Sequence, residues 1–263
     1  MTKALHTLMY RLIDYAGMFP PASLTMQEAL RNYECYREGP QAWALGRFVV
    51  PSAHLSEVDP NWDYVVLGAP PRAVPVCELK VERAADAAPL LDTLPEGVTA
   101  YFELPIEADP APLARGRGRA KVRTGGLTPD AFPSSGDLAH FLFRCAEARV
   151  PFKATAGLHH PIRSLQRCTY EPDSPRTLMH GFVNVFLAAS LLWHGGKVSD
   201  AVATLEEQSP DAFDFDNEAA EWHRHRLTLD QLREAREQFA ISFGSCSFEE
   251  PIVDLERLGW LSI

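Results

Sequence analysis

The chain has 263 residues, a length that suits one large α/β barrel, whose typical size is about 250 residues. With 46% hydrophobic and 23% charged residues, the composition excludes an intrinsically disordered chain and provides for a sizeable core. The formal net charge of -10 excludes partners that reward a broad basic surface, so we expect neither nucleic acid nor an anionic membrane as partner. An anionic ligand would need a local basic pocket.

The five cysteines are widely spaced and form no CxxC pair, so the sequence suggests neither a disulfide framework nor a cysteine zinc site. The first residues interrupt their apolar run with His6, Arg11 and Asp14, which the core of a signal peptide does not do. The longest apolar stretch, 182–193, is too short to span a bilayer. We therefore expect a cytoplasmic protein with one domain, 1–263, and leave homo-oligomer formation open.

Strand-like runs that end in turn residues recur along the chain. Eight are expected, at residues 11–17, 46–52, 63–70, 75–81, 99–105, 120–126, 150–157 and 239–248. Helical patterns with recognisable starts lie between several of them, as where Thr25 precedes a helical run with Glu28 three residues further on. Strands that alternate with helices predict a parallel sheet, and this rhythm predicts a (β/α)8 barrel of the TIM type.

Two connections depart from the rhythm. Only a few residues separate the third and fourth runs, whereas a parallel crossover needs at least about ten to twelve. Either a helix is missing there or one strand is misassigned. The second departure is a long insertion before the last strand, at about 162–238, whose patterns are mostly helical. We expect it to form a helical subdomain or lid over the barrel mouth.

Polar residues occupy alternate positions on four successive expected strands. These i and i+2 pairs are Glu78 and Lys80, Tyr101 and Glu103, Lys121 and Arg123, and Lys153 and Thr155. Because side chains alternate faces along a strand, each pair shares one face, which in a barrel is the interior. The alternative is an antiparallel sheet with these charges in water. Buried cations are costly unless they are paired or put to use, so the barrel interpretation implies a reaction centre.

Lys153 lies in the run VPFKATAGLHHP, near the expected barrel mouth and near Lys121 and Arg123. Desolvation and these neighbouring cations would lower the pKa of Lys153 and leave a neutral amine able to attack a carbonyl, as Schiff-base chemistry requires. The segment FKATAG resembles the Lys-x-Ser/Thr-x-Gly strand of the deoxyribose-phosphate aldolase type of barrel. This resemblance implies that Lys153 forms the imine, although the following His159-His160 departs from the aldolase pattern. The alternative roles are an ion pair with Glu103 and simple anion binding.

Further candidates lie at strand ends, where barrel loops build active sites. His159 and His160 directly follow a strand and could act as general acid or base. Asp14 ends the first strand, where a carboxylate serves equally as base, metal ligand or turn cap. The expected substrate-binding residues are Lys121, Arg123, Thr155, Arg163, His180, Asn184 and Ser245.

Together these patterns predict an aldolase-like lyase or an isomerase that acts on a small anionic carbonyl compound. The expected catalytic residues are Lys153, His159, His160, Asp14 and Glu103, with no cofactor. One alternative is a metal-dependent hydrolase or lyase, in which a divalent metal binds His159 or His160, His180 and a carboxylate, although no HxH or HExxH spacing is present. The other alternative is a non-catalytic anion-binding protein.

Overall fold

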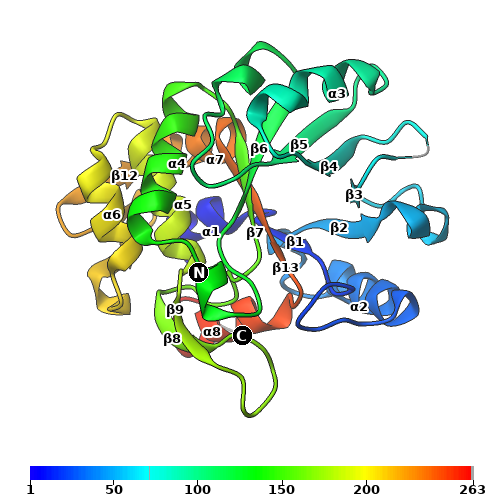
Figure 1. Cartoon of the computed structure of the whole chain (residues 1–263). Coiled ribbons are helices and arrows are strands. Elements are labelled where there is room, and N and C mark those ends of the chain that lie inside the picture. The colour runs from blue at the N-terminus through cyan, green and yellow to red at the C-terminus, as the bar shows by residue number, and fades with distance from the viewer. Residues whose placement is uncertain (71, 262–263) are drawn as a thin grey trace.

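A closed barrel of eight parallel strands forms the centre of the molecule, seen in a computed structural model that describes residues 1–70 and 72–261 (Figure 1). Residues 71, 262 and 263 of the expected domain lie outside this description. The barrel strands, in chain order, are β1 (Ile13–Tyr15), β2 (Leu45–Pro51), β3 (Tyr64–Leu67), β4 (Val76–Lys80), β5 (Thr99–Glu103), β6 (Gly118–Arg123), β7 (Phe152–Thr155) and β13 (Ala240–Ser245). All eight match the expected runs, and the TIM-barrel-like fold predicted from the sequence is confirmed.

Both strands at the short third connection belong to the barrel. β3 and β4 pair in parallel, with Val66 opposite Cys77 and Leu67 opposite Glu78. The missing element is therefore the helix between them, because residues 68–70 and 72–75 contain none. The other helices of the first part of the chain are α1 (Lys3–Met9), α2 (Met26–Glu38), α3 (Ala87–Thr93) and α4 (Ser135–Glu147). Short 3-10 turns lie at Ala42–Ala44, Ser52–Glu57, Ala84–Asp86, Ala111–Arg115, Pro129–Ala131 and Pro210–Ala212.

The insertion between β7 and β13 differs from the expected helical subdomain because it also contains five strands. β8 (Ser164–Arg167) and β9 (Arg176–Met179) form a hairpin, and β10 (Phe213–Phe215), β11 (Ala219–Trp222) and β12 (His225–Thr228) form an antiparallel sheet. Its helices are α5 (Phe182–Trp193), α6 (Val198–Glu206) and α7 (Leu229–Gln238), and α8 (Glu249–Arg257) follows β13. Residues 218–221, EAAE, have the composition of a helix, but burial of Ala220 and Trp222 on β11 and of Leu227 on β12 outweighs that propensity.

The insertion does not act as one lid over the barrel mouth either. α5 and α6 pack beside α4 on the outside of the barrel, and β10 and β11 contact α1. Only the β8–β9 hairpin reaches the carboxyl end of the barrel, where Cys168 and Met179 line the cavity described below. The expectation of a lid is therefore wrong for most of the segment.

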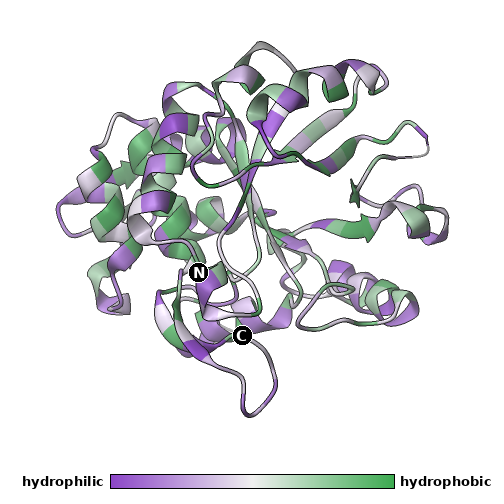
Figure 2. Cartoon of the chain, viewed as in Figure 1, coloured by the Kyte–Doolittle hydropathy of each residue, from purple (hydrophilic) through white to green (hydrophobic). Residues whose placement is uncertain are grey.

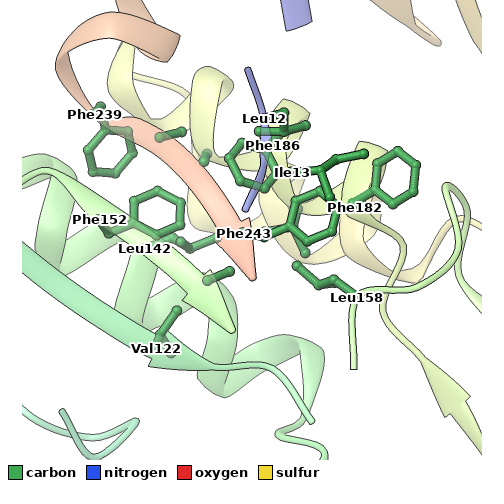
Figure 3. Packing of buried hydrophobic residues seen from close by; sticks show 14 of the residues in the cluster. Leu12, Ile13, Val122, Leu142, Phe152, Leu158, Phe182, Phe186, Phe239 and Phe243 are labelled. Carbon is green, nitrogen blue, oxygen red and sulfur yellow. The ribbon is translucent and has the colours of Figure 1, made fainter. Parts of the chain in front are cut away.

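The main apolar core lies between the barrel and its outer helices. Figure 3 shows Phe152 of β7 and Phe243 of β13 meeting Phe182 and Phe186 of α5. The ring centroids of Phe182 and Phe243 are 5.2 Å apart, and those of Phe152 and Phe239 are 5.0 Å apart. All twelve residues of α5 are buried in this layer, so its apolar character reflects packing. The outer helices in Figure 2 carry both purple and green residues, as expected for helices with one buried face.

The barrel interior is divided into an apolar and a charged part. Val49, Val65, Val76 and Tyr101 form a small separate apolar cluster, with Phe19 packed against it. The remaining interior contains buried lysines and carboxylates. No helix within residues 1–70 and 72–261 is long and apolar enough to cross a membrane.

Candidate active site

A cavity of about 560 Å³ opens at the carboxyl ends of the barrel strands. The last residues of five successive strands, β3 to β7, line it: Leu67, Lys80, Glu103, Arg123 and Thr155. Loops at this end of an α/β barrel build the active site in essentially every characterised barrel enzyme. The position and size of the cavity therefore define the candidate active site.

The glycines that end β6 and β7 shape one wall of this cavity. Gly157 has a φ of +77°, which glycine adopts without strain, and a Cβ atom there would lie 2.9 Å from the Cα atom of Gly125. The two loops therefore pack backbone against backbone. Thr124 fixes this contact by donating a hydrogen bond of 2.6 Å from Oγ1 to the carbonyl oxygen of Ala156. Glycine is needed here so that the strands carrying Lys121 and Lys153 end together at the mouth.

Lys153 lies at the floor of the cavity between two carboxylates. Its Nζ is 2.6 Å from Oδ2 of Asp14 on β1 and 2.5 Å from Oε1 of Glu78 on β4. Asp14 is held in turn by Ser242, whose hydroxyl donates to Oδ2 at 2.8 Å, and by the backbone N–H of Arg47, which donates to Oδ1 at 2.7 Å. The amine is 1% exposed, so both its position and its partners are fixed.

Lys121 extends the same network toward the mouth. Its Nζ is 2.7 Å from Oε2 of Glu78 and 2.9 Å from Oε2 of Glu103. Glu78 therefore bridges the two lysines, one with each oxygen. Five side chains from the strands β1, β4, β5, β6 and β7 thus form one connected charged network: Asp14, Glu78, Glu103, Lys121 and Lys153. The structure brings together Glu103, Lys121 and Lys153, as the alternation of polar residues along the strands predicted, and adds Asp14 from β1.

The charge state of Lys153 differs from the expected neutral amine. Burial disfavours its ammonium form, but the negative charges of Asp14 and Glu78 outweigh burial and raise the pKa of Lys153 above its ordinary value. Burial raises the pKa of Glu78, but its two lysine partners outweigh burial and lower the pKa of that carboxyl to about 2. The sequence interpretation considered the neighbouring cations and omitted the carboxylates between them, so the direction of the expected shift is wrong.

Arg123 and Thr155 occupy the upper wall of the cavity. The guanidinium of Arg123 is 53% exposed and lies 3.9 Å from Glu103, at the outer limit of an ion pair. It is therefore available to a ligand, as a carboxylate or phosphate group would require. Thr155 lines the cavity one strand away. Apolar residues close the opposite side, among them Phe19, Val49, Leu67 and Met179.

The two histidines after β7 both turn toward α8. Nδ1 of His159 is 2.9 Å from Glu250, and Nδ1 of His160 is 2.6 Å from Asp254, one helical turn further along. Only His159 lines the main cavity, while His160 faces a smaller surface pocket. His160 therefore lies away from Lys153 and does not join the charged network.

Four expected substrate-binding residues lie outside the cavity and stabilise the fold. Asn184 is fully buried, accepting from the backbone N–H of Arg163 and donating to the carbonyl oxygens of Thr204 and Glu207. His180 is hydrogen bonded to the carbonyl oxygen of Pro133 and to Arg163, and burial lowers its pKa to about 4. The expectation that these residues bind substrate is not matched by their positions. Ser245 also lies outside the cavity, and its buried hydroxyl accepts a hydrogen bond from the backbone N–H of Ser247.

The expected metal ligands do not converge. Within the described part of the chain, no group of three His, Cys, Asp or Glu side chains is arranged to hold a metal ion. His180 faces the carbonyl oxygen of Pro133, and the carboxylates of Asp14 and Glu103 are already paired with lysines. The geometry thus gives no support to a site built from these residues.

Two residues beside Lys153 escaped the sequence interpretation of the site. Glu78 belonged to a recognised alternating pair with Lys80, but a carboxylate on the fourth strand had no partner that the sequence could identify. Tyr101 likewise belonged to such a pair, and its ring centroid lies 5.7 Å from Nζ of Lys153. Their inward direction was readable, whereas their contacts depend on strand register.

No family model, curated protein or solved structure matches the chain. The side chains of the cavity are then the basis for a functional proposal.

Proposed function

We propose that the protein is a lyase or isomerase that acts on a small anionic carbonyl compound through a Schiff base on Lys153. The observation that carries the proposal is the buried amine held between Asp14 and Glu78 at the floor of a cavity at the carboxyl ends of the strands. The likeness of FKATAG to the imine-forming strand of deoxyribose-phosphate aldolase-type barrels supports the same role for Lys153.

The carboxylates favour the imine although they also favour the ammonium. A lysine ammonium and a protonated imine carry the same positive charge on the same nitrogen. The two anions that raise the pKa of Lys153 therefore stabilise the iminium as well. The two carboxylates disfavour only the deprotonation of Lys153 that precedes its attack on the carbonyl. They are also the nearest groups able to accept that proton.

The imine step can be written with all its atoms accounted for. Lys153 passes a proton to Glu78 or Asp14, and the neutral amine adds to the carbonyl carbon to form the C–N bond. A nitrogen proton moves to the former carbonyl oxygen, giving a carbinolamine. The protonated carboxyl then returns its proton, the C–O bond breaks, water leaves, and the iminium remains.

The next step separates a lyase from an isomerase. In a lyase, the neighbouring C–C bond breaks, its electrons move to the iminium nitrogen as an enamine forms, and the hydroxyl proton of the departing carbon passes to a base. In an isomerase, a C–H bond breaks instead and the proton passes to the base. Glu103 lines the cavity beside Lys121 and is the carboxylate placed to accept it. Arg123 would hold the anionic group of the substrate at the mouth.

Borohydride trapping tests the proposal directly. The protein is incubated with pyruvate or glyoxylate as small anionic carbonyl probes, reduced with borohydride, digested and mapped by mass spectrometry. We expect a secondary amine on Lys153, absent from Lys153→Met and retained in Lys80→Met, a control at the exposed rim of the same cavity. Because deprotonation limits attack, trapping should accelerate from about pH 7 to about pH 9. Labelling confined to exposed lysines would contradict the proposal.

Cysteine chemistry supports a proposal for the cellular location. All five cysteines are free thiols, and four of them are buried. Free thiols are typical of a reducing compartment. We therefore place the proposed enzyme in the cytoplasm, which fractionation of cells that express the chain would test.

A further inference from the structure

A second cavity, of about 570 Å³, lies at the opposite end of the barrel. It is lined by residues at or just before the amino ends of four barrel strands: Arg11, Arg47, Arg119 and Ile241. Residues of α1 and α7 complete it. This cavity has no residue in common with the candidate active site, and it plays no part in the proposed Schiff-base chemistry.

Five of the ten residues that line this second cavity are arginines, and one is acidic, Glu237. Such a concentration is unexpected in a chain whose formal net charge is -10. Two of the arginines already have carboxylate partners, since Arg11 pairs with Asp63 and Arg233 lies 2.7 Å from Asp230. Their charges are largely neutralised.

Arg236 has a structural explanation without a carboxylate. It is buried and donates to the carbonyl oxygens of Leu8 at 2.8 Å and Tyr10 at 3.2 Å, at the carboxyl end of α1. It also donates to carbonyl oxygens at the start of β13, including that of Ile241 at 2.6 Å. A cation at the end of a helix is favourable, so Arg236 joins α1 to the barrel.

Arg47 and Arg119 have no such explanation. Arg119 donates to the hydroxyl of Tyr101 at 3.0 Å, and its guanidinium lies 5.6 Å from the centroid of the same ring, but Tyr101 is neutral and no carboxylate within residues 1–70 and 72–261 pairs with Arg119. Over the same residues the guanidinium of Arg47 has no hydrogen bond or ion pair, although its backbone N–H is bonded to Asp14. Both are partly buried inward-facing cations in a cavity whose lining holds three further arginines, of which Arg236 also lacks a carboxylate partner among the described residues. Like charges gathered in this way are unfavourable unless an anion joins them.

Rings form another wall of the second cavity. His6 stacks on Trp43 with centroids 4.9 Å apart, and Tyr10 beside it is 52% exposed. His6 and Tyr10 both line the cavity. A ligand there would thus meet guanidinium groups on one side and flat ring surfaces on the other.

We propose that this cavity binds a small polyanion that carries phosphate or carboxylate groups, with Arg47 and Arg119 as its principal ligands. The planar fork of a guanidinium matches the oxygen atoms of both groups and can donate two parallel hydrogen bonds. A cavity of this volume is in the range of small-molecule sites. The negative surface of the protein makes an extended nucleic acid an unsuitable occupant.

Isothermal titration with pyrophosphate and with citrate, at constant ionic strength and in a buffer without other polyanions, tests the proposal. We expect saturable binding of one molecule per chain. Arg47→Gln should weaken it at least tenfold, and Arg47→Gln combined with Arg119→Gln should abolish it. Arg224→Gln is the matched control, because that side chain is 82% exposed and lies outside the cavity. Arg123→Gln, at the other end of the barrel, should also bind normally, which separates this proposal from the proposed active site.

The two ligands distinguish the sources of the anion. Tighter binding of pyrophosphate assigns the site to a phosphorylated compound, and tighter binding of citrate assigns it to a polycarboxylate. Arg47→Lys keeps the charge but loses the fork, so a folded Arg47→Lys protein with weakened binding supports the bidentate contact even if Arg47→Gln is unstable. Failure of both ligands to bind the wild type, or equal binding by the folded double variant, would overturn the proposal.

Discussion

The two ends of the barrel use the same strands in different ways. Along β6, Arg119 points into the cavity at the amino end, and Lys121 points into the cavity at the carboxyl end two residues later. In the neighbouring strand β5, Tyr101 lies opposite Arg119 and Glu103 lies opposite Lys121. At the amino end, the guanidinium of Arg119 therefore lies beside a neutral phenol. Two residues further along both strands, the ammonium of Lys121 lies beside a carboxylate.

This difference shows that strand alternation and charge pairing are separate determinants. Alternation places cations in the interior at both ends. Carboxylates that other barrel strands bring into the interior then decide whether a cation is neutralised, as for Lys121 and Lys153, or left for a ligand, as for Arg47 and Arg119. Removal of charge should therefore affect stability in opposite ways at the two ends.

The largest expected effect is at the carboxyl end. Glu78→Gln leaves Lys121 and Lys153 with one fewer anion in a buried site, and breaking a buried ion pair from one side typically costs about 3–5 kcal/mol. We expect the free energy of unfolding to fall by that amount in urea titrations. The same substitution at the amino end, Glu237→Gln, changes an exposed carboxylate and should cost less than about 1 kcal/mol. Equal losses in the free energy of unfolding for the two variants would contradict the proposed difference between the two ends of the barrel.

The pH dependence of stability should show the same network. The pKa of Glu78 is about 2 in the folded protein, below its ordinary value of 4.5. A depressed carboxyl pKa stabilises the fold above pH 4.5, and this contribution is lost as the pH falls from 4.5 toward 2. The loss should approach about 3 kcal/mol. Urea titrations across this range should show it in the wild type and not in Glu78→Gln, whereas parallel curves would contradict the assignment.

Residues that were expected to bind substrate but lie outside both cavities should show an intermediate loss of stability. Asn184→Ala removes three hydrogen bonds and leaves the partly buried backbone N–H of Arg163 and carbonyl oxygen of Glu207 without this partner, whereas the carbonyl oxygen of Thr204 still accepts from the backbone N–H of Glu207. Leaving such groups unsatisfied costs about 1–3 kcal/mol each, so a decrease in stability of at least that size is expected. Borohydride trapping on the folded variant should be unchanged. A stable variant with altered trapping would restore Asn184 as a substrate ligand.

The sequence predicted the barrel strands and the inward direction of their polar residues because both depend on local periodicity. Runs such as AKVRTGG and VPFKATAG show their alternation and their glycine ends directly. The contacts of Glu78 were not predictable, because its two lysines lie 43 and 75 residues further along the chain, on strands that do not pair with β4, and only closure of the barrel brings them together. The sign of the Lys153 pKa shift depended on those contacts and was wrong for that reason.

Other errors arose where tertiary packing outweighs local pattern. The sequence interpretation assigns His180 and Asn184 to substrate binding. Both instead satisfy backbone groups, at Pro133 and at the end of α6. The strand β11 was missed because its Ala and Glu residues favour helix in isolation, and β12 follows it directly in the same segment. Long-range partners, which decide such cases, are not visible in one sequence.

The smallest expected effect is at the amino end and has the opposite sign. Arg47→Gln removes one of several neighbouring cations and breaks no side-chain hydrogen bond or ion pair recorded in residues 1–70 and 72–261. Its cost should stay within about 0.5 kcal/mol, and at low ionic strength relief of repulsion should make the variant slightly more stable than the wild type. Because salt screens such repulsion, sodium chloride should raise the melting temperature of the wild type more than that of Arg47→Gln. Thermal unfolding at low and high salt, without polyanions, measures both values. A loss above about 1 kcal/mol would mean that Arg47 is structural like Arg236 and that the amino end is not held open for a ligand.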